Sequence, residues 1–174
     1  MATQHATRFE ELVLPHLDDA YTLARYLVRD EHDAQDVVQD AALRALRHLD
    51  GFRDGDARAW LLAIVRNCCF SLHRKHRVNR AVVPLTDDLA NGLAGSRPAD
   101  ALAMETSDRE RVHAAVATLP EDLREVIVLR ELNDLSYREI SDVVGIPMGT
   151  VMSRLSRARD RLAVALGAGA KEAS

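Results

Sequence analysis

The sequence predicts an all-α protein of two small helical domains joined by a flexible linker, with a helix-turn-helix in the second domain. The chain has 174 residues, of which 47% are hydrophobic and only 4% aromatic. This composition favours helices, and eight glycines with five prolines are too few for a turn-rich all-β fold. Helical periodicity of apolar residues is clear in both parts of the chain and fades between them. We place the domains at 1–80 and 109–168, the linker at 81–108 and a disordered tail at 169–174.

Three helices are expected in the first domain. Apolar spacing predicts one amphipathic helix over residues 9–27. Asp30 can cap a second helix, which Gly51 ends. A third helix begins with a cap at Asp56, after a turn, and runs to about residue 77.

Two further helices are expected ahead of the helix-turn-helix. The helical pattern resumes near Arg109. Pro120 suits the start of the next helix, because an amide hydrogen there would have no partner anyway. Glu121 and Asp122 suit the positive N-terminal end of that helix. Its apolar face is formed by Val126, Ile127, Leu129 and Leu132.

The helix-turn-helix is the most informative feature of the chain. Ser136 and Glu139 form a capping box that starts its first helix. Gly145 can take the left-handed conformation that ends that helix, and Pro147 suits the start of the next one. The second helix carries arginines mostly off its apolar stripe, at Arg154, Arg157, Arg159 and Arg161. A basic second helix in this motif has the geometry that enters a DNA major groove.

The net charge of −4 hides a strong polarity along the chain. Residues 66–80 contain five lysines or arginines and no acid, and residues 148–162 contain four arginines and one acid. The stretch between them, 84–108, is acidic. Two separate basic patches can hold one long polyanion at two points.

The sequence also bears on compartment and redox chemistry. Residues 1–10 have no apolar core, and no apolar stretch approaches the roughly 20 residues needed to span a bilayer, so we expect a cytosolic protein. Cys68 and Cys69 are adjacent and do not form a secreted disulfide framework. Helical geometry predicts that Cys68 lies in the core and Cys69 near its edge, with redox sensing left open.

Other chemical interpretations are weaker. Asp36 and Asp40 share a helix face and could hold a metal in a nuclease, but no second catalytic group accompanies them. His73 and His76 lie one turn apart, with no cysteine at ligand spacing, so neither a metal nor a cofactor is expected. Trp60 is either a core anchor or a platform on which a base stacks.

Three blocks, in order along the chain, resemble bacterial RNA polymerase sigma factors of the extracytoplasmic-function (ECF) group. Residues 33–45 resemble the helix that binds core polymerase, and 60–77 the segment that melts the promoter. Residues 119–155 resemble the DNA-binding C-terminal domain. The resemblance implies a factor that is not itself an enzyme. Such a factor would direct RNA polymerase to the promoters of a stress or signal response, and an anti-sigma factor would restrain it.

The resemblance also implies roles for individual residues. Contacts to core polymerase are expected from Asp36, Gln39, Asp40 and Arg44. Contacts to the melted minus-ten element are expected from Asn67, Arg74, Lys75 and Arg77. Contacts to the minus-thirty-five duplex are expected from Tyr137, Arg138, Thr150, Ser153, Arg154, Arg157 and Arg159.

Two positions depart from the family pattern. Met152 stands where the family often has a basic residue, and Ser71 stands where many relatives carry aspartate. Both differences bear on promoter sequence and not on the class of function. The main alternative is a stand-alone helix-turn-helix regulator, which would need a sensory or dimerising N-terminal half.

Overall fold

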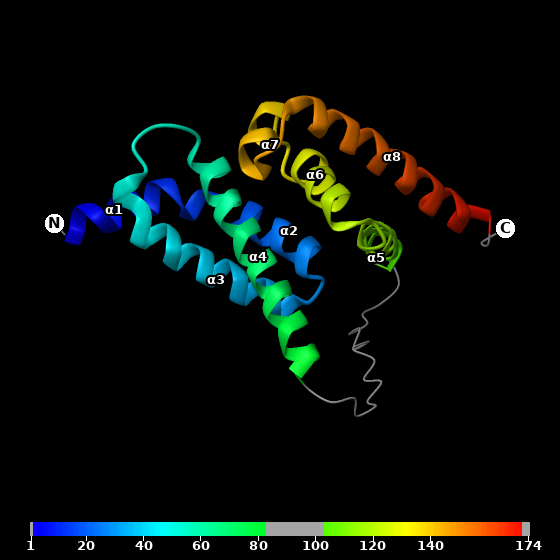
Figure 1. The fold of residues 1–174 in the computed structure, drawn as a ribbon, viewed down its shortest axis with the longest axis horizontal. Helices are drawn as coiled ribbons and strands as arrows, with labels where there is room; N and C mark the ends of the chain where they lie inside the picture. The colour runs from blue at the N-terminus through cyan, green and yellow to red at the C-terminus, as the bar shows by residue number, and fades with distance from the viewer. Residues whose placement is uncertain (1, 83–102, 172–174) are drawn as a thin grey trace.

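The computed structural model describes residues 2–82 and 103–171, and every regular element in these ranges is helical. The first domain contains α1 (Ala2–Leu12), α2 (Leu17–Val28), α3 (Glu31–His48) and α4 (Ala57–Val82). The second contains α5 (Ala103–Ala117), α6 (Glu121–Glu131), α7 (Tyr137–Val144) and α8 (Met148–Lys171). Figure 1 shows the two sets of helices as neighbouring groups, with α8 running outward to the C-terminus.

The first helical segment differs from the prediction. Residues 9–27 do not form one helix, because α1 ends at Leu12 and a 3-10 turn over Leu14–His16 precedes α2. Pro15 explains the break, since proline has no amide hydrogen and its ring clashes with the carbonyl four residues earlier. The interruption lets α2 pack against both α3 and α4.

The predicted caps of α3 and α4 are confirmed. The Asp30 carboxylate accepts a hydrogen bond from the Asp33 amide at 2.9 Å, which also holds the pKa of Asp30 below its ordinary value. The Asp56 carboxylate accepts hydrogen bonds from the amides of Arg58 and Ala59 at 2.8 and 3.2 Å. These bonds satisfy amides that have no partner within the first helical turn.

The predicted helix-turn-helix is confirmed in detail. The Ser136 hydroxyl accepts from the Glu139 amide at 3.2 Å, and the Glu139 carboxylate accepts from the Ser136 amide at 2.6 Å. Gly145 takes the left-handed conformation at φ 75° and ends α7. Pro147 immediately precedes α8, and its carbonyl accepts from the amides of Thr150 and Val151.

The buried apolar side chains of both domains form one continuous core. α2 and α4 of the first domain pack against α6 and α7 of the second, and we call this packing the closed arrangement. α6 is covered on nearly all sides, since Leu123–Leu129 are all buried. Its predicted apolar residue Leu132 is instead 40% exposed. Among the described helices, α6 therefore both contacts the first domain and is the most buried.

Helix ends extend into ranges expected to be irregular. α4 continues to Val82, and α5 begins at Ala103, ahead of Arg109. The rest of the predicted linker lies outside the described residues. α8 runs to Lys171, so residues 169–171 are helical where a disordered tail was expected. The alanine-rich sequence there explains the extension, since alanine has the highest helix propensity.

Both cysteines are buried, so the expectation that Cys69 lies near the edge of the core is wrong. Cys68 and Cys69 are 4% and 1% exposed, because α4 is covered by α2, α3 and α7. Burial raises the pKa of Cys68 to about 11 and that of Cys69 to about 12. Thiols in this state are not reactive at neutral pH. Within residues 2–82 and 103–171, every helix is too short or too polar to span a bilayer.

The capping box gives a test of the fold. Ser136→Ala should lower the free energy of unfolding by about 1 kcal/mol, because the Glu139 amide loses its acceptor. Chemical denaturation followed by circular dichroism measures the change. Ser156→Ala, at an exposed position inside α8, is the matched control and should change little. Equal losses in the two variants would contradict the assigned role of the cap.

Candidate nucleic-acid interface

The second helix of the helix-turn-helix, α8, presents a polar face to solvent. Its opposite side is anchored by Val151, Leu155 and Ala158, which are at most 1% exposed. Ser153 and Arg157 lie one turn apart and are both exposed. The N-terminal half of α8 can therefore reach the edges of base pairs in a major groove.

Other predicted contacts to duplex DNA surround this face. Arg138 is exposed and Thr150 is half-buried. Arg159 donates to a Glu131 carboxylate oxygen at 2.7 Å, a bond that raises the pKa of the arginine. The guanidinium of Arg130 lies over the Tyr137 ring, 5.3 Å from the centroid of that ring, and this contact fixes the ring at the start of α7.

Two methionines make the start of α8 partly apolar. Met148 and Met152 are 47% and 54% exposed and lie one helical turn apart. An exposed methionine at this place can contact a thymine methyl group but cannot donate a hydrogen bond to guanine. Met152 therefore offers DNA an apolar contact, where an arginine or lysine would offer a charged donor.

The predicted minus-ten contacts all lie on α4. Asn67, Arg74, Lys75 and Arg77 are exposed along this helix. Asn67 and Arg74 lie two turns apart on one side of α4, whereas Lys75 borders a cavity against α3 and Arg77 borders a cavity against α2 and α6. Trp60 lies against Phe52, with ring centroids 4.8 Å apart, and packs against the core. This packing supports the core-anchor interpretation.

The predicted polymerase contacts share one side of α3. Asp36, Gln39 and Arg44 are exposed, and Arg44 pairs with Asp40 at 3.0 Å. Between α3 and α4 these acids line a cavity of about 360 Å³ together with Lys75. In the part of the chain that the structure describes, no three histidine, cysteine, aspartate or glutamate side chains gather as metal ligands would.

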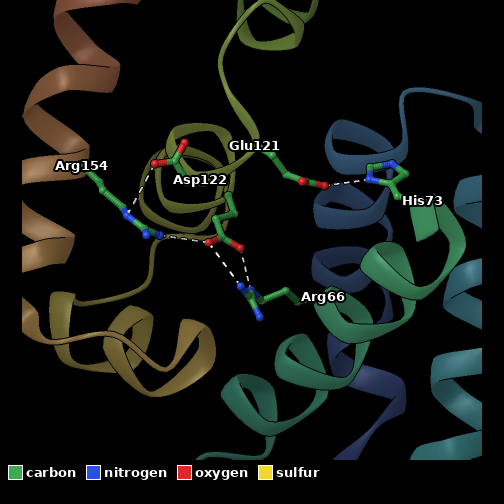
Figure 2. A network of polar contacts seen from close by, with 6 residues as sticks. Arg66, His73, Glu121, Asp122 and Arg154 are labelled. Carbon is green, nitrogen blue, oxygen red and sulfur yellow. Dashed lines mark hydrogen bonds and ion pairs between the residues drawn. The ribbon is translucent and has the colours of Figure 1, made fainter. Parts of the chain in front are cut away.

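A second predicted DNA contact, Arg154, is also engaged in ion pairs and is less exposed than Arg159. Arg154 is only 21% exposed, and its Nη1 donates to a Glu125 carboxylate oxygen at 3.3 Å. Its Nε lies 3.8 Å from an Asp122 carboxylate oxygen. Arg66, from the first domain, donates from Nε and Nη2 to the same Glu125 carboxylate at 2.6 and 3.3 Å. We call these four residues the Glu125 network, and Figure 2 shows Arg66 and Arg154 converging from α4 and α8.

Glu125 is the key residue that sequence reasoning missed. Its side chain is 2% exposed, and burial raises its pKa, although Arg66 and Arg154 oppose this shift. The neighbouring Arg124 is also buried, and its guanidinium donates to the carbonyls of Val116, Ala117 and Leu119. The signal in the sequence was that Arg124 and Glu125 stand together within a run of apolar residues, because charged side chains that are buried need fixed partners.

Further polar contacts join the two domains. His73 Nδ1 on α4 lies 2.7 Å from a Glu121 carboxylate oxygen (Figure 2). The Asn133 side-chain amide, 1% exposed, donates to the Asp19 carbonyl of α2 at 3.0 Å. Hydrogen bonds have preferred directions, so these contacts fix the relative orientation of the two domains as well as the distance between them.

The chain matches two family descriptions, one in each domain. Residues 12–78 match the family described as Sigma-70 region 2, and residues 109–162 match the one described as Sigma-70, region 4. The two matches coincide with α2–α4 and with α5–α8.

Known proteins resemble the chain over most of its length. The RNA polymerase sigma-H factor of Pseudomonas aeruginosa is 35% identical over 91% of this chain and 86% of that protein. The ECF RNA polymerase sigma factor SigE of Mycolicibacterium smegmatis is 30% identical over 88% of this chain, which spans only 60% of that protein's length. The sigma factor RpoE of Bartonella quintana, solved with the anti-sigma factor NepR, matches with a TM-score of 0.72 at 29% identity, over 91% of this chain and 96% of that one.

The Glu125 network predicts a specific pattern of stabilities. Arg66→Ala should lower the free energy of unfolding by about 2 kcal/mol, because a buried carboxylate loses two charged hydrogen bonds. Adding Glu125→Gln to that variant should recover part of the loss, because a neutral amide leaves no unpaired buried charge. Urea denaturation of both variants, with the exposed-site control Arg53→Ala, measures these changes. Equal stability of the single and double variants would show that the buried charge is not the cause.

Proposed function

We propose that this chain, which belongs to the ECF group of RNA polymerase sigma factors, directs core polymerase to a specific set of promoters. The carrying observation is the exposed polar face of α8, with Ser153 and Arg157 on a helix whose other side is buried. Arginine suits this role because its fork of donors matches the acceptors of guanine in the major groove.

We further propose that each domain has its own target. The exposed residues Asn67, Arg74, Lys75 and Arg77 of α4 would hold the melted minus-ten strand, since basic side chains follow phosphates while an amide can bond to a base edge. The exposed acidic side of α3 would bind core polymerase. Two contacts of modest affinity on one chain then give tighter binding together, because the second domain binds intramolecularly once the first is bound.

The chain is not an enzyme, because sigma factors act by binding and the polymerase performs the phosphoryl transfer. A stand-alone regulator is not favoured, since the first domain matches the sigma-70 region 2 family and not a sensory domain. The cytoplasm, where polymerase and promoter DNA meet, is the proposed place of action.

The closed arrangement suggests how the factor is restrained. Arg154 of the DNA-binding helix is paired with Glu125 and Asp122 of its own domain, and Arg66 of the first domain binds the same Glu125 carboxylate, so the domain contact and the pairing of Arg154 meet at one residue. The similarity to a sigma factor solved with an anti-sigma partner supports a comparable partner here, one that holds this arrangement until a stress or other signal releases it. Such a partner, purified with the chain, should abolish transcription when it is added back to polymerase.

The proposal predicts sigma-dependent transcription in a purified system. Core polymerase without its own sigma factor should produce new transcripts from a promoter library only when this protein is added. Arg157→Ala should reduce them by about tenfold, because a bidentate base contact is lost, whereas Arg53→Ala should not. Failure of the protein to bind core polymerase would contradict the assignment.

The pairing of Arg154 gives a second prediction. Glu125→Gln should bind a duplex containing the minus-thirty-five element about threefold more tightly than the wild type, in the absence of polymerase, because the neutral amide no longer pairs with Arg154. Removing a negative charge can by itself raise affinity for DNA, so Glu110→Gln, which removes the same charge at an exposed position, is the control and should change the affinity less. Fluorescence anisotropy measures the affinity. Unchanged or weaker binding would show that the Glu125 network does not restrain the helix.

A further inference from the structure

A basic cavity of about 440 Å³ lies where the two domains meet, and of its lining residues only Arg77 has a role in the proposed function. Its volume is in the range of small-ligand sites. The first domain contributes the ends of α2 and α4, and the second contributes α6. The positively charged or protonatable side chains that line it are Arg29, His73, His76, Arg77, Arg80 and Arg124.

The charge in this cavity is poorly balanced. Among the described residues that line it, Glu121 is the one acid, and its carboxylate already lies against His73 at 2.7 Å. Among the described residues, Arg29, Arg77 and Arg80 make no ion pair. Burial lowers the pKa of Arg124, and the positive charge of Arg29 lowers it further. Apart from Arg124, the basic side chains of the lining belong to the first domain, and an anion held between them and Arg124 would relieve the repulsion that Arg124 meets there.

Arg124 makes the site more than a patch of surface charge. It is 4% exposed, and three backbone carbonyls hold its guanidinium in place. The backbone of Arg29 takes the left-handed conformation at φ 66° that caps α2, and its side chain is exposed. The Nε and Nη2 atoms of Arg124 donate to these carbonyls, which leaves its Nη1 to donate to an anion oxygen.

We propose that this basic cavity binds a small polyphosphate anion, such as a nucleoside polyphosphate or inorganic polyphosphate, and that the bound anion stabilises the closed arrangement. The site is complete only when α6 packs against α2 and α4, so a ligand that needs both sides selects that state. The inference rests on the closed arrangement used in the proposed function. Binding to the purified chain needs neither polymerase nor promoter, so its failure is distinguishable from failure of the sigma assignment.

Calorimetric titration of the full chain with inorganic tripolyphosphate tests the proposal. Saturable binding at one site is expected for the wild type. Arg29→Gly and Arg80→Ala should each weaken it by about fivefold or more, since each removes a guanidinium from the cavity. Glycine adopts the left-handed conformation freely, so Arg29→Gly preserves the cap of α2. Arg53→Ala removes the same charge from an exposed loop and should change the affinity by less than about twofold.

Two further arms separate the alternatives. Arg66→Ala lies outside the cavity but should also weaken tripolyphosphate binding, because it loosens the closed arrangement. A single-stranded oligonucleotide should bind Arg29→Gly as well as it binds the wild type, if the cavity takes a free anion and not promoter phosphates. Absence of saturable binding, equal losses in Arg29→Gly and Arg53→Ala, or loss confined to the oligonucleotide would overturn the proposal.

Discussion

A carboxylate buried between two domains constrains this molecule more than any other group. Glu125 is 2% exposed, and an isolated charge in that position would cost several kcal/mol. Its partners are Arg66 from the first domain and Arg154 from the second, so the charge is compensated only while both are in place. The apolar core drives the helices together, and this carboxylate determines which arrangement of the domains is acceptable.

The same carboxylate links the domain contact to the helix-turn-helix. Arg154 belongs to the helix that carries Ser153 and Arg157, and it is held by acids of α6 in its own domain. Arg66 directly precedes Asn67 on α4. Separating the domains would therefore remove Arg66 from Glu125 and leave Arg154 as the remaining partner of that carboxylate. Burial raises the pKa of Glu125, although both arginines oppose this shift, so the loss of either partner would destabilise the charged form.

Local signals in the sequence predicted the helix-turn-helix well, because capping at Ser136 and chain reversal at Gly145 depend on a few neighbouring residues. The break at Pro15 was equally local and was overlooked. Helical spacing predicted that the arginines of α8 lie mostly off its apolar stripe, and Arg157 and Arg159 are exposed there. The domain contact did not, because the partners of Glu125 lie 59 and 29 residues away and no spacing rule connects them. The burial of Cys69 was not predicted for the same reason, because the residues that cover it belong to other helices.

The central claim is that the free chain is held closed by the Glu125 network. Small-angle X-ray scattering of the purified protein at neutral pH tests it directly, with the Arg66→Ala variant measured in parallel. The account predicts that the wild-type curve matches the closed arrangement of α2 and α4 against α6 and α7, and that the variant has a larger radius of gyration. A wild-type curve that requires separated domains, or identical curves for the two proteins, would contradict it.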